Sequence, residues 1–292
     1  MKNILITGAS GFLGSHLIEA LQKMQFKVYA LTSKKDNLKG KYENCELYSI
    51  KEWENNLFPI NEIDVVVHCA FARAHKEGKE IAESLLFSNT IFKKVVQKKI
   101  PAIINISTQE VYGKSPIPWI ENIVEPSTIY GVAKFFSEIN LLELSKTSNT
   151  KATNIRLAGL LGIETESRMV NKFVYKAIKD EPLKLLDGRL VFSQLYITDA
   201  VNGIISLLNI PFSKWEPVYN LGYTKSYSII EIANTVKKVG KVFNKNIQII
   251  LEKSNLVIEA ELDSSSFNKV TEWSPKFDME SIVMEIYKSR LK

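Results

Sequence analysis

The first half of the chain alternates short apolar runs with longer segments of helical periodicity, and this alternation constrains the fold more than any other feature. The runs contain few polar residues, so both faces of each predicted strand should be buried. Between them, segments such as 77–98 and 129–146 carry apolar residues at helical spacing. The pattern predicts a parallel sheet with helices on both faces. The predicted strands are 3–7, 26–32, 46–50, 64–70, 102–108 and 152–158.

After about residue 162 the alternation becomes less regular. Helices are predicted over about 168–180 and 228–240 and from about 278, with strands at 218–222 and 246–251. We therefore expect a doubly wound α/β domain from residues 1–165 and about 192–222. A smaller, interleaved C-terminal lobe, expected to bind substrate, would comprise about 166–191 and 223–292. The two parts should share the cleft where ligands of α/β proteins usually bind.

Composition is that of a soluble globular protein, with 45% hydrophobic and 24% charged residues in 292. The apolar run Ile4–Ile6 is too short for a signal peptide, and no stretch approaches the length of a membrane span. We expect a cytoplasmic protein that binds no membrane. The net charge of +6 comes from scattered lysines, as on an ordinary solvated surface; it is compatible with a mild attraction for phosphorylated ligands and does not demand nucleic acid.

The cysteines and histidines give no sign of a metal site. Cys45 and Cys69 lie in different segments without CxxC spacing, and Cys69 belongs to an apolar run typical of a buried strand. His16, His68 and His75 have no spacing typical of metal ligands. We expect no metal.

Three glycines lie at the junction of the first predicted strand and helix: Gly8, Gly11 and Gly14. The first permits a tight turn, the second lets a pyrophosphate approach the backbone, and the third lets helix and strand pack closely. The N-terminus of the helix offers unpaired N–H groups to an anion. The GxxGxxG spacing at this position predicts a Rossmann-type sheet that binds a dinucleotide.

The end of the second strand bears on the choice of cofactor. An acidic residue there would bond the ribose 2′-hydroxyl of NAD, whereas hydroxyl or basic side chains suit the 2′-phosphate of NADP. The sequence reads Thr32-Ser33-Lys34-Lys35, with no carboxylate before Asp36. NAD(P) is therefore the expected cofactor, with NADP favoured and NAD left open. A solvated pair of lysines is the alternative interpretation.

Tyr130 and Lys134 are four residues apart on one face of a predicted helix. A phenol has a pKa of about 10, but a nearby ammonium and an oxidised nicotinamide would stabilise the phenolate and make it a usable base. Thr108 stands upstream at the end of a predicted strand. The order glycine loop, Thr, YxxxK gives the motif weight that it lacks alone.

Together these motifs resemble the NAD-dependent epimerase/dehydratase family of the extended short-chain dehydrogenase/reductase superfamily. The resemblance extends over nearly the whole chain and also includes Asn89, Arg156, Asp263 and Trp273. The matching segments are TGASGFLG (7–14), DVVVHCA (64–70), STQEVYG (107–113), YGVAK (130–134), YITDAV (196–201) and VYNLG (218–222).

The resemblance implies roles for these residues. Thr108 would bond the reacting sugar hydroxyl, Tyr130 would be the acid/base, and Lys134 would hold the nicotinamide ribose and lower the pKa of the tyrosine. The remaining cofactor contacts would come from Gly8, Gly11, Phe12, Leu13 and Gly14 at the pyrophosphate, from Ala70 in the cleft, and from Thr32, Ser33, Lys34 and Ser49 at the adenosine end.

The chain also departs from the family pattern. Ser49 takes the place of an Asp that bonds adenine, Gly159 and Leu161 replace the Asn and Tyr of the RxxNxYGP turn, and Phe192 replaces a phosphate-binding Arg. Arg189, Arg168 or Lys172 could compensate by pairing with phosphate.

STQEVYG resembles the STDEVYG of nucleotide-sugar 4,6-dehydratases, which need an acid at the third position. Gln109 stands there, and an amide cannot protonate a leaving group, so dehydration is disfavoured. Glu110 keeps the position of the possible base. We expect Gln109 to orient the sugar.

Three functions follow from these observations. The first is a nucleotide-sugar epimerase acting by transient hydride transfer, most commonly at C4, and the second is an NADPH-dependent 4-ketoreductase of a deoxysugar nucleotide. The third is a non-catalytic cofactor-binding scaffold or sensor, which the survival of Thr108, Tyr130 and Lys134 disfavours.

A homodimer is a further expectation, because the helices predicted over 77–98 and 129–146 often form such an interface in this fold. Their apolar stripes could equally pack in the core. The residues concerned are Phe87, Ile91, Val95, Phe135, Ile139 and Leu142.

Overall fold

The computed structural model describes residues 2–24 and 26–292, and of residues 187–189 it describes the backbone alone. Its main feature is a seven-stranded sheet in the order β10-β6-β5-β4-β1-β2-β3, with every neighbouring pair parallel. The strand order reverses between β1 and β4, where a crevice opens at the carboxyl ends of the strands. The strands are β1 (Lys2–Thr7), β2 (Phe26–Thr32), β3 (Cys45–Ser49), β4 (Val65–His68), β5 (Ala102–Thr108), β6 (Lys151–Leu157) and β10 (Val218–Leu221).

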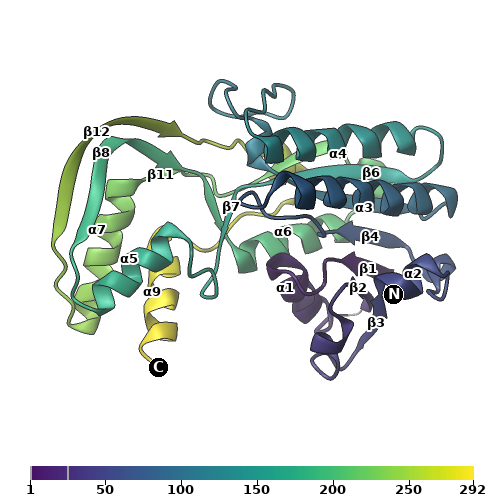
Figure 1. Cartoon of the computed structure of the whole chain (residues 1–292), viewed down its shortest axis with the longest axis horizontal. Helices are drawn as coiled ribbons and strands as arrows, with labels where there is room; N and C mark the ends of the chain where they lie inside the picture. The colour runs from purple at the N-terminus through teal and green to yellow at the C-terminus, as the bar shows by residue number, and fades with distance from the viewer. Residues whose placement is uncertain (1, 25) are drawn as a thin grey trace.

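Helices cover both faces of this sheet (Figure 1). Alternate side chains of β1 show why: Leu5 packs into one apolar cluster, whereas Ile4 and Ile6 pack into the other. One face carries α2 (Ile50–Glu54), α3 (Gly78–Gln97) and α4 (Ile129–Ser145); the other carries α1 (Phe12–Leu21) and α6 (Ile197–Asn209). The predicted doubly wound α/β fold is confirmed.

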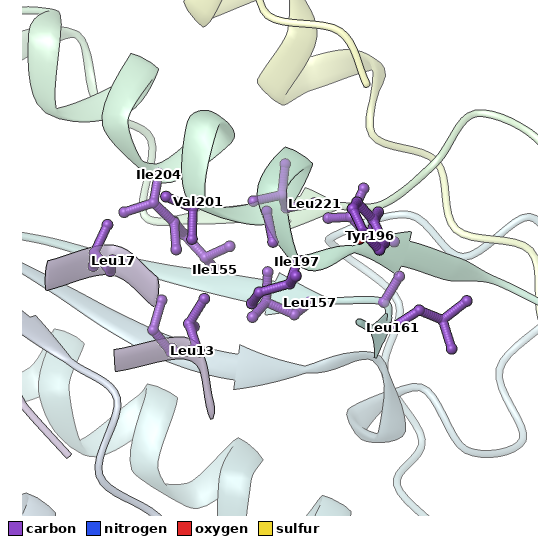
Figure 2. Close-up of a cluster of buried hydrophobic side chains, with 14 of the residues drawn as sticks. Leu13, Leu17, Ile155, Leu157, Leu161, Tyr196, Ile197, Val201, Ile204 and Leu221 are labelled. Atoms are coloured by element: carbon purple, nitrogen blue, oxygen red, sulfur yellow. The ribbon is translucent and has the colours of Figure 1, made fainter. Parts of the chain in front are cut away.

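Figure 2 shows part of the apolar cluster on the α1 and α6 side of the sheet. Leu13 and Leu17 of α1 meet Ile155 and Leu157 of β6, with α6 above them. Burial of such side chains contributes about 1.5–3 kcal/mol each, which fixes the start of α1 against the sheet.

A second body is built around a three-stranded sheet in the order β11-β8-β12, with helices packed on it (Figure 1). Its strands are β8 (Leu183–Phe192), β11 (Tyr227–Ser228) and β12 (Ile249–Glu259), and its helices are α5 (Met169–Ile178), α7 (Ile229–Gly240) and α9 (Met279–Arg290). The predicted helices of this region are confirmed within two residues. The strand predicted at 246–251 continues much further, because the exposed, partly charged residues after it pair with β8 at the edge of the sheet.

Two short strands connect the bodies: β7 (Gly159–Leu161) pairs with β9 (Gln194–Tyr196) as the chain leaves and re-enters the large sheet. Helix α8 (Ser265–Thr271) packs against β10 and α6, although it falls within the range 223–292 expected for the smaller lobe. No helix in the described part of the chain is both long and apolar enough to cross a bilayer. Single 3-10 turns are η1 (Lys35–Leu38), η2 (Ile60–Glu62), η3 (Gln109–Val111), η4 (Phe212–Lys214) and η5 (Lys241–Phe243).

Candidate functional site

The glycine loop between β1 and α1 has the geometry of an anion cradle. Gly8 has φ +69°, and a Cβ there would lie 2.8 Å from the backbone of Ala70; a Cβ on Gly14 would collide with the carbonyl of Gly8. Gly11 begins α1 with no side-chain cap, and the first turn holds no acidic residue. The positive end of the helix is therefore left for a negatively charged ligand. These residues fit a dinucleotide pyrophosphate, as expected from their spacing.

A cavity of about 360 Å³ adjoins this loop, and four of the residues expected at the cofactor line it: Gly8, Thr32, Ser33 and Ala70. The Thr32 hydroxyl donates to Ser10 Oγ at 3.2 Å and accepts from the Lys34 amide at 3.0 Å. The Lys34 side chain is exposed beside the cavity. The end of β2 therefore presents hydroxyl groups to this cavity.

Ser49 has another task than the one expected from its position. Its hydroxyl donates to Glu52 at 2.7 Å and accepts from the Glu52 amide at 3.2 Å, forming a capping box at the start of α2. Glu52 in turn pairs with Lys35 at 2.7 Å. The Ser49 hydroxyl thus makes both of its hydrogen bonds within the cap of α2. The neighbouring Ile50, not Ser49, lines the cavity.

A larger cavity of about 780 Å³ opens on the other side of the loop, between the large sheet and the segment before α5. It brings together residues from β5, η3, α4 and β7 that are far apart in the sequence. The expected site residues that line it are Phe12, Leu13, Thr108, Gln109, Glu110, Tyr130, Lys134, Gly159 and Arg168.

Local backbone geometry holds Tyr130 beside Thr108. Thr108 ends β5 and caps η3 by accepting from the Glu110 amide at 3.2 Å, and Thr128 caps α4 by accepting from the Gly131 amide at 2.9 Å. Gly131 lies directly against the carbonyl of Glu110, where a Cβ would collide. The glycine after the tyrosine therefore allows η3 and α4 to pack closely.

Burial is the main influence on the pKa of the Tyr130 phenol. Burial raises the pKa of Tyr130 to about 12, and the charge of Glu110 acts in the same direction. The Thr108 hydroxyl and the charge of Arg168 lower the same pKa, but less. The direction is opposite to the lowering expected from the YxxxK motif, because that expectation included the positive charge of an oxidised nicotinamide.

Lys134 lies one turn further along α4 and is 4% exposed. Burial lowers the pKa of Lys134 to about 8, although the charge of Glu138 opposes this. Its ammonium donates to the carbonyl of Ile106 at 2.5 Å, and lies 4.2 Å from the centre of the Phe71 ring. The lysine is therefore fixed at the base of the cavity.

The wall behind Lys134 is a buried ion pair between Arg156 of β6 and Glu138 of α4, with an N–O distance of 2.7 Å. Arg156 also donates to the Tyr112 hydroxyl at 3.0 Å, and Tyr112 donates to Asn220 of β10 at 2.6 Å. Ser107 donates to Glu138 as well. This network joins α4 to β5, β6 and, through Tyr112, β10 of the large sheet.

Gln109 carries a polar atom with no partner. Its side-chain Oε1 is buried and accepts no hydrogen bond within the described structure, and the residue lines the larger cavity. A buried acceptor left without a donor costs about 1–3 kcal/mol. The role of Gln109 in orienting a sugar stays a prediction.

Other expected substrate contacts lie elsewhere. Phe192 is half-buried and packs against the main apolar cluster, paired with Tyr227 across β8 and β11. Leu161 is fully buried in the same cluster. Lys172 is exposed outside both cavities. The side chain of Arg189 lies outside the described residues.

Among the cavity residues not expected from the sequence are Phe71, Arg73 and His75, all in the loop after β4. A signal existed, because the carboxyl end of β4 meets the topological switch point, where ligands bind. In the part of the chain that the structure describes, no group of three or more His, Cys, Asp or Glu side chains is arranged to hold a metal ion.

The two expected stripes on α3 and α4 divide between core and surface. Ile91 and Val95 are fully buried, so they belong to the core. Ile139 is 44% exposed. The outward face of α4 carries exposed apolar residues spaced three, four and three apart: Ile129, Val132, Phe136 and Ile139. The sequence pattern alone did not separate these exposed residues from the buried ones.

Comparisons with known proteins agree with this geometry. Residues 4–222 match the model of the NAD dependent epimerase/dehydratase family. UDP-glucuronic acid decarboxylase 1 of Danio rerio is 28% identical over 82% of this chain and 60% of its own length, and Protein CapI of Staphylococcus aureus is 27% identical over 83% and 85%. The chain thus spans about three fifths of the length of the first curated relatives that it matches.

Among solved structures, the UDP-N-acetylglucosamine 4-epimerase of Bacillus cereus superposes with a TM-score of 0.86 over all of both chains, at 23% identity. That similarity establishes the fold. With three quarters of the chain covered by the family model and the glycine loop, Thr108 and the YxxxK pair placed around one cleft, the chain belongs to the NAD-dependent epimerase/dehydratase family.

Proposed function

We propose that the protein is an NAD(P)-dependent nucleotide-sugar epimerase that acts by transient hydride transfer at C4 of the sugar. The observation that carries the proposal is the larger cavity, which Thr108, Tyr130 and Lys134 line together beside the glycine loop. Its volume of about 780 Å³ lies in the range of small-molecule sites. Several related proteins are 4-epimerases by name, among them UDP-arabinose 4-epimerase 1 of Arabidopsis thaliana.

In this mechanism the residues divide the work of binding and proton transfer. The glycine loop would bind the pyrophosphate, and Lys134 would hold the nicotinamide ribose while its charge favours the tyrosinate. A bound nicotinamide would supply the acceptor and the later donor of the hydride. Tyr130 takes the proton of the C4 hydroxyl, which Thr108 orients, and gives it back after the 4-keto sugar has turned over.

The raised pKa of Tyr130 fits this cycle. A phenol that is protonated in the free protein becomes a base only when positive charge is added nearby, so the base would be generated when the oxidised dinucleotide binds. Gln109 hydrogen-bonds a hydroxyl but cannot protonate a leaving group, so no elimination step is part of the proposal.

The substrate we propose is a nucleotide diphosphate sugar. Arg168 lines the cavity at the start of α5, and Arg73 lines it from the loop after β4. Both guanidinium groups can pair with phosphate oxygens. Arg168 thereby takes over part of the task of the Arg that Phe192 replaces.

For the cofactor we propose NADP in preference to NAD. Ser33 lines the adenosine cavity and Lys34 follows it on the exposed side. Glu83 lines the same cavity and would oppose a 2′-phosphate, so both dinucleotides have to be measured. A lower Kd for NADPH than for NADH in wild type, reversed in Lys34→Asp, is the expected result.

A 4-ketoreductase is the second candidate, favoured by the same Ser33-Lys34 end of β2. The two reactions differ in redox balance: the reductase consumes one NADPH per product, whereas the epimerase interconverts two sugars without net loss of NADPH absorbance. Incubation with a panel of nucleotide sugars, with product analysis and absorbance at once, separates them. Absence of turnover on any sugar, unchanged by Tyr130→Phe, would favour the scaffold.

We further propose a homodimer through α3 and α4. The outward face of α4 carries Ile129, Val132, Phe136 and Ile139, and Leu86 of α3 is 69% exposed. An apolar stripe of this length is self-complementary when two copies pack about a two-fold axis. A second copy of the chain is therefore the proposed partner.

A further inference from the structure

Phe71 lies between the two cavities and lines both of them. Its ring centre is 4.2 Å from the ammonium of Lys134 and 6.0 Å from the ring centre of Tyr130, edge on. The ring is half-buried. In this structure it therefore covers the two side chains that the proposed reaction brings to the nicotinamide ribose.

The backbone on either side of Phe71 is tied down. The Ala70 amide donates to the Thr7 hydroxyl at 3.4 Å, and the Ala72 amide donates to the Ser84 hydroxyl at 3.0 Å. Ala70 also lies directly against the backbone of Gly8. Because both neighbours are anchored, the ring can leave Lys134 by rotation about its own side-chain bonds, between staggered rotamers, without moving the loop.

A dinucleotide bound at the glycine loop and at Lys134 has to pass the position of Phe71. The two cavities that the ring separates lie at the two ends of that path, with Gly8 at one and Lys134 at the other. The ring therefore lies against the ammonium that the proposed function assigns to the ribose.

We propose that Phe71 is a gate on the cofactor cleft: its ring occupies the place beside Lys134 when the gate is closed, and dinucleotide binding requires the ring to turn away. This rests on the proposed dinucleotide binding. The gate also selects among ligands. A ligand that fills the adenosine cavity but does not reach Lys134 makes no additional contact when the ring turns away.

Only molecules in which the ring has turned away bind dinucleotide. The apparent affinity for dinucleotide is therefore lowered in proportion to the fraction of molecules in which the gate is open. A cation–π contact corresponds to roughly a 2- to 30-fold shift in an equilibrium, from exposed to desolvated sites. Removing the ring should remove this reduction. For Phe71→Ala we expect the Kd of NADPH and NADH to fall at least about threefold.

The test is a fluorescence and calorimetric titration of full-length wild type and Phe71→Ala with both dinucleotides. Tyr175→Ala is the matched control, because Lys179 lies 4.3 Å from the Tyr175 ring on the surface, away from both cavities. Circular dichroism melting verifies that each variant is folded. A tighter Kd in Phe71→Ala alone supports the gate; an unchanged or weaker Kd overturns it.

A second measurement does not depend on the alanine variant. Wild type labelled with fluorinated phenylalanine gives a 19F resonance for Phe71, assigned by its loss in Phe71→Leu. We expect this resonance to shift when dinucleotide saturates the protein; a resonance that stays in place overturns the gate. If wild type and Phe71→Ala both fail to bind either dinucleotide, the proposed function falls together with the gate, whereas binding with equal Kd removes the gate alone.

Discussion

At the scale of single residues, the proposed chemistry depends on the surroundings of one phenol. Burial raises the pKa of Tyr130 and the charge of Glu110 raises it further, whereas a hydrogen bond with Thr108 and the charge of Arg168 lower it. The same residues line the cavity where substrate is proposed to bind. The charge of each neighbour should therefore be visible in the pH dependence of turnover.

Tyr130→Phe removes the proposed acid/base and leaves the ring in place. We expect kcat to fall by about 100-fold or more, as is typical when a general acid/base is lost, while the Kd for dinucleotide changes less than twofold. Steady-state kinetics with direct titration of the dinucleotide measures both. A variant that retained most of its kcat would rule out the assigned role.

Two substitutions should move the pH profile in opposite directions. Glu110→Gln removes a negative charge beside Tyr130 and lowers its pKa, so the ascending limb of kcat/KM should move to lower pH. Arg168→Gln removes a positive charge, and the limb should move to higher pH. Profiles that move together, or not at all, would contradict the assignment of Tyr130 as the titrating base.

At the scale of elements, the site depends on how closely η3 and α4 pack. Gly131 is the contact point, against the carbonyl of Glu110. Of the two threonines that cap these elements, Thr108 also lies beside the reacting phenol. A small displacement between the two elements would separate Thr108 from Tyr130.

Gly131→Ala tests this packing. The added methyl group should push η3 from α4, lower the free energy of unfolding by about 1–3 kcal/mol and reduce kcat about tenfold or more. Gly78→Ala is the matched control, since a Cβ there meets no other atom within 4 Å. Urea denaturation and kinetics measure the two effects; equal behaviour of the two variants would refute the role of close packing.

The proposed homodimer rests on the exposed apolar residues of the outward face of α4. Phe136 is 58% exposed at the centre of its apolar stripe, so Phe136→Asp should place a charge in the interface and halve the mass found by light scattering. Tyr175→Asp, equally exposed on α5, should leave the mass unchanged. A wild-type protein that is already monomeric at micromolar concentration would exclude the dimer.

At the scale of the whole molecule, a buried polar network connects α4 to the large sheet and to the C-terminal segment. Arg156 and Glu138 are its charged centre, and Asn220 extends it by donating to the carbonyls of Trp119 and Asp263, each at 2.9 Å. The fold can therefore be weakened far from the cleft by disturbing this centre.

Arg156→Met leaves the Glu138 carboxylate buried without its partner. We expect the free energy of unfolding to fall by about 3–5 kcal/mol, measured by urea denaturation. Lys146→Met breaks the exposed pair with Glu143 and should cost less than about 1 kcal/mol. Similar losses in the two variants would show that the buried pair does not hold the sheet and α4 together.

Local sequence rules sufficed to predict the structure where the backbone conformation or a close contact accepts only one residue type. Gly8 has a positive φ and Gly14 a close contact that other residues cannot accept, and apolar runs bounded by turns gave the strands of the large sheet. Ser49 was assigned from its position in the family pattern, although Glu52, three residues on, completes the S-x-x-E signature of a capping box at the start of α2. Phe192 could not be placed from the sequence, because its pairing with Tyr227 joins β8 to β11, which lie far apart in the chain. Phe71 could not be placed for the same reason: its contact with Lys134 joins the loop after β4 to α4 only in the folded chain.

The proposed function requires reversible hydride transfer at C4 within one site. Nucleotide sugars labelled with deuterium at C4 test it directly, with the dinucleotide supplied and the products examined by NMR and mass spectrometry. We expect two C4 epimers to interconvert with the label still at C4 and with no net change in nicotinamide absorbance. Stoichiometric oxidation of NADPH, or epimers without the label at C4, would contradict it.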